Sequence, residues 1–257
     1  MRLRQVALAA SDLECTVSDL CRIFGLEVAF RDPGVAVFGL RNAVLPVGDS
    51  FLEVVSPVRA DAPAARFLER RGGDAGYMVI VQTDDLAAAR ERVGRLGVRI
   101  VFEHAHEAGH TATIHLHPRD VGGAILSLDA SQPPGSWDWA GPDWEKQVRR
   151  DVADSLAGAT LESDDPAGLA AHWAALLGRP ASALGGDVFA IALEGSTIRF
   201  VPAHGRGERF AAVDLVAASA RARERALAAA ARSGLATPGG AIRIAGTELR
   251  LVESADL

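Results

Sequence analysis

The sequence contains few cysteines and few aromatic residues. Of its 257 residues only two are cysteine and 5% are aromatic, whereas 49% are hydrophobic. Both cysteines, Cys15 and Cys21, fall within one predicted helix, and their six-residue spacing is poor for a disulfide. Because a disulfide framework is typical of secreted proteins, its absence makes a cytoplasmic location the default expectation.

The sequence also lacks basic runs and long apolar runs. Its 27 Lys and Arg residues against 33 Asp and Glu residues give a net charge of −6, which argues against nucleic-acid binding. No apolar stretch reaches the roughly 18 residues that a membrane helix needs. The start, MRLRQVALAASDLE, predicts a strand rather than a signal peptide because Asp12 and Glu14 interrupt its apolar part.

What the sequence does contain is one pattern that occurs four times: a strand, a capped helix and further strands. In each occurrence the interval between the first strand and the glycine that ends the helix is nearly constant: Gln5 to Gly25, Met78 to Gly97, Gly158 to Gly178, and Val213 to Gly234. In the first occurrence we predict strands near Glu27–Phe30, Ala36–Leu40 and Ala43–Val47, with Phe51–Ser56 as the last. This spacing predicts an α+β fold of four βαβββ modules.

Each module has a second sheet face that needs a partner, so the modules are expected to pair into two half-open cups. The segment SQPPGSWDWAGPDW, residues 131–144, follows neither the helix nor the strand period and contains three tryptophans. It predicts a linker held against a surface. The expected domains are a paired-module domain over 1–130, a linker over 131–151 and a second, diverged paired-module domain over 152–257.

The first half resembles the vicinal oxygen chelate superfamily, which includes glyoxalases, bleomycin-resistance proteins, extradiol dioxygenases and methylmalonyl-CoA epimerases. The stretches QVALAASDLE, FGLEVAF, FLEVVSPVRADAPAARFLERRGG and HPRDVGGAILSLD carry the resemblance, over about residues 3–130. Within that superfamily the epimerase and glyoxalase I branch is the most similar. Over 155–253 only the module pattern persists.

The resemblance implies a site formed by the first and last strands of two modules, where the superfamily holds a divalent metal with histidine, Glu or Gln. The corresponding positions in the first half are Gln5, Glu53, Met78 and Ser127. Glu53 and Gln5 could offer oxygen ligands, but the thioether of Met78 and the hydroxyl of Ser127 suit a hard cation poorly. We therefore expect a substrate-binding cup with no metal and no other cofactor.

Glu53 is the candidate catalytic residue, because an inward-facing carboxylate costs free energy unless it is paired or used. A purely structural role, with Arg31, Arg41 or Gln5 as partner, is the alternative. In the second half the corresponding positions are Gly158, Arg199, Val213 and Arg250. Arg199 and Arg250 could form an anion pocket in a second cup. Alternatively, they pair with local carboxylates such as Glu248 or Glu253.

The stretch EHAHEAGHTATIHLHP concentrates five histidines, His104, His106, His110, His115 and His117. Alternation along a strand places His115 and His117 on the face with Thr111 and Thr113, where they could contact substrate beside Glu53. A metal site in this hairpin is a separate hypothesis. A structural role for His117 in the HPRDVGG motif is a further alternative.

Three functional hypotheses follow. The leading one is a glyoxalase-like protein that acts on or binds a small organic acid or a thioester-like metabolite, as a lyase or isomerase if it is an enzyme. The second is a non-catalytic protein that sequesters a drug or metabolite, as resistance proteins of this superfamily do. The third is a metalloenzyme that uses the histidine-rich hairpin. A small-molecule ligand is the expected partner, and a homodimer is a second candidate.

Overall fold

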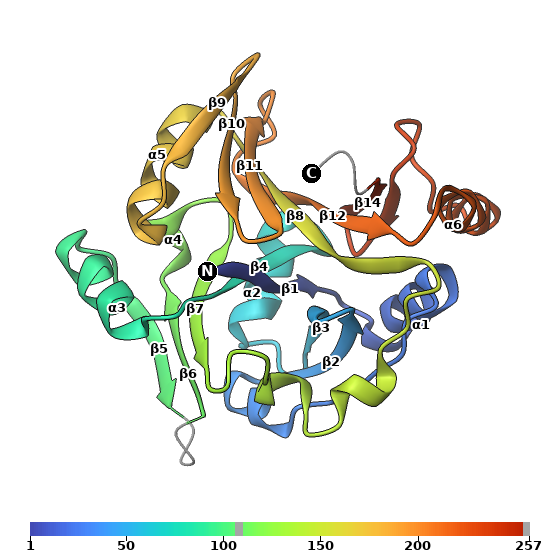
Figure 1. The fold of residues 1–257 in the computed structure, drawn as a ribbon, viewed down its shortest axis with the longest axis horizontal. Helices are drawn as coiled ribbons and strands as arrows, with labels where there is room; N and C mark the ends of the chain where they lie inside the picture. Colours follow the sequence, from blue (N-terminus) through green and yellow to red (C-terminus); the bar gives the residue numbers. More distant parts are fainter. Residues whose placement is uncertain (106–109, 254–257) are drawn as a thin grey trace. The chain divides into compact units, whose positions relative to one another are not determined.

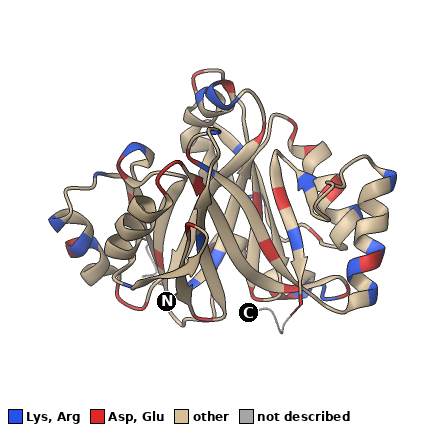
Figure 2. Cartoon of the chain, turned by 90° about the horizontal axis from the view of Figure 1, so that it is seen from above, with Lys and Arg blue, Asp and Glu red and all other residues tan. Residues whose placement is uncertain are grey.

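The computed structural model describes residues 1–105 and 110–253. Its strands belong to two mixed sheets, with helices packed on them (Figure 1). Among the described residues, no helix is both long and apolar enough to cross a membrane. Acidic and basic residues are interspersed over strands and helices (Figure 2).

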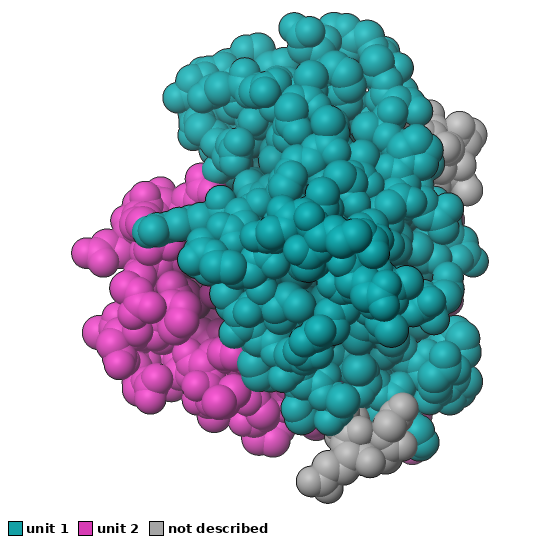
Figure 3. Space-filling view, turned by 90° about the vertical axis from the view of Figure 1, so that its left-hand side faces the viewer, with its two compact units in different colours: residues 1–4, 78–138, 158–211 teal, residues 5–77, 139–157, 212–257 magenta. Residues whose placement is uncertain are grey.

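The chain divides into two compact units, and each unit combines segments that are distant in sequence (Figure 3). Unit 1 comprises residues 1–4, 78–138 and 158–211, and unit 2 comprises residues 5–77, 139–157 and 212–257. The predicted domain ranges, 1–130 and 152–257 with a linker between them, stay a prediction.

Unit 2 contains β2 (Leu40–Val47), β3 (Ser50–Pro57) and, from Gln5 on, β1 (Arg2–Ala9), in the order β2-β3-β1. β3 runs parallel to β1 and antiparallel to β2. The helices of this stretch are α1 (Leu13–Phe24), the 3-10 helix η1 (Pro33–Phe38) and α2 (Pro63–Arg71). From the end of the chain come β12 (Arg209–Ala217), α6 (Ala220–Arg232), β13 (Ile242–Ile244) and β14 (Thr247–Val252), with strand order β13-β14-β12.

In unit 1 the first group of elements is β4 (Ala75–Gln82) from Met78 on, α3 (Leu86–Arg95), β5 (Ile100–Ala105), β6 (Thr111–Leu116), α4 (Pro118–Val121) and β7 (Ile125–Ser131). The second group is β8 (Ala153–Ser163) from Gly158 on, α5 (Pro166–Leu177), β9 (Ala181–Gly185), β10 (Val188–Leu193) and β11 (Ser196–Pro202). The strand orders are β4-β7-β6-β5 and β8-β11-β10-β9.

Local sequence signals account for most helix ends. The Asp12 side chain accepts a hydrogen bond from the Cys15 N–H at 3.0 Å and caps α1, which ends at Gly25 with a left-handed φ of 68°. Asp165 caps α5 in the same way through the Gly168 N–H, and Gly178 ends that helix. The buried face of α1 contains the predicted apolar stripe, from Leu13 to Phe24.

Two predicted strands of the first module are wrong. Residues 27–30 contribute only one isolated bridge, between Phe30 and Val44. The segment Ala36–Leu40 is mostly the 3-10 helix η1, because Asp32 caps it by accepting the Gly34 N–H at 2.7 Å and Pro33 occupies its first turn. Two strands that we did not predict, β9 and β10, follow α5.

The segment between the two groups of unit 1 contains two short 3-10 helices, η2 (Asp138–Ala140) and η3 (Trp144–Gln147). Trp137 and Trp144 are buried, at 1% and 7% exposure. Within unit 2 the Trp144 ring meets the Phe51 ring of β3 edge-on, with 5.0 Å between centroids. The prediction that tryptophans hold this segment against a surface is therefore confirmed.

Candidate functional site

The register of three strands in unit 2 brings three polar side chains onto one face. Glu53 of β3 lies opposite Ala7 of β1 and Val44 of β2. Gln5 is two residues before Ala7, and Asn42 is two residues before Val44. Because side chains alternate along a strand, both lie diagonally beside Glu53 on the same face of the sheet.

Glu53 is held by two amide groups. Gln5 Nε2 donates to Glu53 Oε2 at 2.8 Å, and Asn42 Nδ2 donates to Glu53 Oε1 at 2.6 Å. All three side chains are buried. Asn42 is oriented in turn by its own oxygen, since Asn42 Oδ1 accepts the Asp32 N–H at 2.8 Å. We call Gln5, Asn42 and Glu53 the amide clamp.

Burial raises the pKa of the Glu53 carboxyl above its ordinary value, because the charged form loses its hydration. The hydrogen bonds from Asn42 and Gln5 lower this pKa, and the nearby charge of Asp32 raises it. Burial is the largest of these effects. The Glu53 carboxylate therefore holds a proton more tightly than an exposed glutamate does.

The amide clamp does not fit the divalent metal that the resemblance implies. Both carboxylate oxygens accept N–H groups, so a cation on Glu53 would face two donors with positive hydrogens. Within residues 1–105 and 110–253, no group of three or more His, Cys, Asp or Glu side chains is placed to hold a metal ion.

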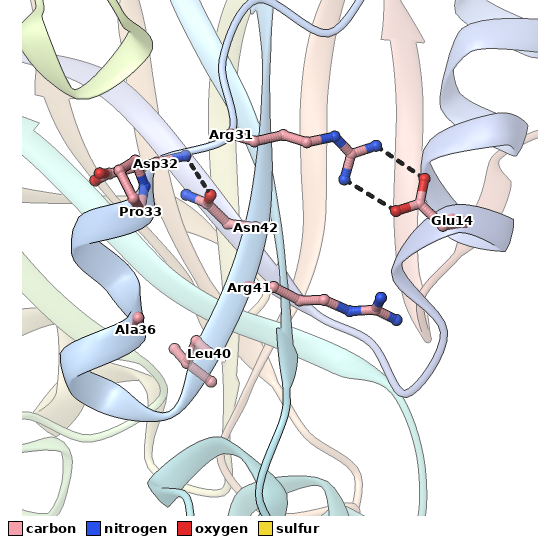
Figure 4. A pocket seen from close by; sticks show the side chains of 8 residues that line it. All are labelled: Glu14, Arg31, Asp32, Pro33, Ala36, Leu40, Arg41 and Asn42. Atoms are coloured by element: carbon pink, nitrogen blue, oxygen red, sulfur yellow. Dashed lines mark hydrogen bonds and ion pairs between the residues drawn. The ribbon is translucent and has the colours of Figure 1, made fainter.

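A pocket of about 400 Å³ lies at β2, next to the amide clamp (Figure 4). Asn42 belongs to both, because it lines the pocket and donates to Glu53. The other lining residues come from α1, the segment before η1, η1 itself and the start of β2: Glu14, Arg31, Asp32, Pro33, Ala36, Leu40 and Arg41.

The two arginines of this pocket differ in their pairing. Arg31 donates through both terminal nitrogens to Glu14, at 2.9 and 2.8 Å (Figure 4). Arg41 is exposed and has no hydrogen-bond or ion-pair partner among the described residues. Of the partners considered for Glu53, the structure selects Gln5 and not either arginine.

In unit 1, Ser127 and His115 lie opposite each other on β7 and β6. Ser127 Oγ is within 2.9 Å of Thr113 Oγ1, and both hydroxyls bond to the buried Asp129 carboxylate. His115 packs against the Phe102 ring at 5.0 Å, and burial lowers its pKa to about 4. The imidazole of His115 is therefore neutral at pH 7.

His117 lies just beyond β6, and a strand face shared with His115 stays a prediction. His117 caps α4: its Nδ1 accepts the Arg119 N–H at 3.1 Å and lies 3.2 Å from Arg99 Nη2. This contact agrees with the alternative structural role for His117. His106 is outside the described residues. The metal hypothesis for this hairpin, like a substrate contact of His117, stays a prediction.

The remaining predicted residues are distributed over both units. Met78 is buried in β4 beside Ile125, and Arg199 of β11 lies opposite Ala190. In unit 2, Arg250 Nε donates to Asp214 Oδ1 at 2.7 Å. Arg250 is thus paired with a local carboxylate, Asp214, whereas Glu248 binds Arg243. The anion pocket in the second half stays a prediction.

Asn42 was not among the predicted site residues because it fell between the predicted strands Ala36–Leu40 and Ala43–Val47. A usable signal was present. The two-residue turn Gly48-Asp49 closes a hairpin in which Val47 pairs with Ser50. Counting back from that turn places Asn42 on the face of Glu53.

Comparisons with known proteins agree with this architecture. A family model described as a glyoxalase-like domain matches residues 6–177. The mitochondrial methylmalonyl-CoA epimerase of Homo sapiens is 27% identical over 129 residues, which are 50% of this chain and 73% of that protein. The ethylmalonyl-CoA/methylmalonyl-CoA epimerase of Cereibacter sphaeroides is 28% identical over 134 residues, which are 50% of this chain and 96% of that protein. A crystal structure of a hypothetical protein from Staphylococcus aureus matches with a TM-score of 0.68 over 98% of both chains at 11% identity, and this likeness concerns the fold alone.

Proposed function

Because the chain belongs to the family of glyoxalase-like domains, we propose that it acts on a small organic acid or an acyl thioester of such an acid. Glu53 is the group that takes and returns a proton on the carbon next to the carbonyl. The observation that carries the proposal is the buried Glu53 carboxylate, whose pKa is raised and whose position is set by two amides. The names of the two epimerases supply the class of test substrate.

The proposed step is a proton transfer with no metal. The C–H bond next to the carbonyl breaks, its proton goes to a Glu53 oxygen, and its electron pair moves to the carbonyl oxygen as an enolate. An amide N–H of the clamp, from Gln5, stabilises that oxygen. Return of the proton to the other face of the carbon would make the protein an isomerase, and expulsion of a leaving group would make it a lyase.

The test is deuterium incorporation into methylmalonyl-CoA in D₂O, followed by NMR. We expect the wild-type chain to incorporate deuterium next to the carbonyl, and Glu53→Gln to reduce the rate at least about a hundredfold, the usual size of a general-base effect. Glu69→Gln, which removes an exposed carboxylate of α2, is the matched control and should keep the wild-type rate. Equal rates in the wild type and in Glu53→Gln would contradict the proposal.

A second candidate, binding without turnover, is favoured by one specific observation. Both Glu53 oxygens are occupied by amide donors, and Asn42 contacts both the pocket and Glu53. A shift of the melting temperature by small acids, thioesters or aromatic drugs, with no deuterium incorporation into any ligand, would favour this candidate. In that case Glu53→Gln should leave ligand affinity close to the wild-type value.

A further inference from the structure

We propose that the pocket at β2 binds a small monocarboxylate and that Arg41 is the residue that pairs with it. This inference goes beyond the proposed function, because Arg41 lies on the opposite face of β2 from Asn42 and Glu53. The pocket volume, about 400 Å³, suits a small organic acid rather than a macromolecular segment.

The first step concerns which cation is available. The Arg31 guanidinium uses both terminal nitrogens on the Glu14 carboxylate, at 2.9 and 2.8 Å. This two-point pair also occupies both oxygens of Glu14, the acidic side chain on the same side of β2 as Arg41 (Figure 4). Arg41 has no partner among the described residues, so its guanidinium can meet an incoming anion.

The second step concerns the charge of the ligand. Two carboxylates, Glu14 and Asp32, and two arginines, Arg31 and Arg41, line the pocket, and their charges sum to zero. The Asp32 carboxylate is itself held by the Gly34 N–H at 2.7 Å. With no excess positive charge, the pocket favours a singly charged group over a phosphate dianion.

The third step concerns the rest of the ligand. Pro33, Ala36 and Leu40 line the pocket with apolar surface. They can cover a short carbon chain while the carboxylate meets Arg41. Asn42 also lines the pocket and donates to Glu53, whereas Arg41, the preceding residue of β2, points to the other face of the strand (Figure 4).

The experiment measures binding of propionate by calorimetry and by NMR of the arginine side chains, with propionamide and inorganic phosphate as comparison probes. We expect propionate to shift the Arg41 side-chain signals, propionamide not to bind, and phosphate to bind more weakly than propionate. Arg41→Gln should weaken propionate about tenfold or more, as expected for loss of a charged hydrogen bond. Arg41→Lys should recover part of the affinity, since it restores the charge but not the two-point geometry.

Two further variants separate this inference from a folding defect. Glu14→Gln should tighten propionate binding, because it frees Arg31 as a second cation, whereas a misfolded pocket would bind less. Arg225→Gln, at an exposed position of α6 outside the pocket, should leave binding unchanged. Unaltered propionate affinity in Arg41→Gln, or phosphate binding tighter than propionate, would overturn the inference. Deuterium exchange that depends on Glu53 reports on the proposed function separately, so either proposal can fail while the other stands.

Discussion

Glu53 shows how a single buried carboxylate is balanced by its surroundings. Burial disfavours its charged form, while two amide N–H groups favour it. The clamp thus supplies hydrogen bonds where the superfamily resemblance implies metal ligands. The two N–H bonds replace part of the hydration that the buried carboxylate has lost.

The raised pKa of Glu53 has a consequence for stability. Because the folded state holds this proton more tightly than the unfolded chain, the stabilisation from Glu53 is complete below its ordinary pKa of about 4.5 and is lost as the pH rises through the folded value. We therefore expect the free energy of unfolding of the wild type, relative to Glu53→Gln, to fall as the pH rises above the ordinary glutamate pKa of about 4.5. Urea unfolding followed by tryptophan fluorescence at several pH values measures this difference. A difference in free energy of unfolding that stays constant or rises with pH would contradict this prediction. Glu69→Gln, which changes an exposed glutamate, serves as the control.

At the scale of elements, the sequence predicted helix ends well, because neighbouring residues in the sequence determine where a helix begins and ends. The helices α1 and α5 begin at a capping aspartate and end at a glycine with positive φ, and both were predicted. Strand assignment was weaker. The segment Ala36–Leu40 has the apolar character of a strand, but Asp32 and Pro33 begin a 3-10 helix there. The strand β9, ASALG, was missed because its small residues have little strand propensity and most are exposed.

Only part of the candidate site was predictable from the sequence. Glu53 and Gln5 could be placed together from the resemblance, and they are joined by a hydrogen bond. Asn42 could not be assigned to the site, because the predicted strand began at Ala43 and left Asn42 outside it. The pocket could not be predicted either, because η1 lines it and η1 was not predicted. The capping role of His117 follows from α4, a helix of four residues too short for a periodic signal.

The turn between β13 and β14 offers a test at this scale. Gly246 has a φ of 65°, and a Cβ built on it would lie 1.9 Å from the Asp74 carbonyl oxygen, whereas Gly240, with a φ of 74°, has open space around it. We expect Gly240→Ala to lower the free energy of unfolding by about 1–2 kcal/mol through the left-handed backbone alone. Gly246→Ala adds a clash with backbone, so it should cost roughly 1–3 kcal/mol more. Chemical denaturation of both variants measures the two free energies of unfolding. Equal decreases in both variants would show that the backbone at Asp74 moves to accommodate the added Cβ at little cost.

At the scale of the whole molecule, the predicted vicinal oxygen chelate membership and α+β fold are confirmed by the family match and by the structural likeness over 98% of the chain. The pairing of helices within each unit was not predicted from the sequence. Within unit 2, α1 packs against α6, and Arg22 donates to Ser233 between them (Figure 1). Within unit 1, α3 packs against α5, and Arg92 Nε donates to the Leu176 carbonyl at 2.8 Å. Every module has an apolar sheet face to cover, so sequence pattern alone does not select the partner.

Each of the two units is built from both halves of the chain. Each unit contains residues from both sides of 131–151, so a fragment 1–151 would lack α6 beside α1 and α5 beside α3. We expect fragments 1–151 and 152–257, produced separately, to melt with less cooperativity and at lower temperature than the full chain, because the helix faces that pair within each unit would stay exposed to water. Mixing the two fragments should restore the full-chain transition, as differential scanning calorimetry would show. If fragment 1–151 alone melted like the full chain, the predicted domains 1–130 and 152–257 would describe the folding units better than units 1 and 2 do.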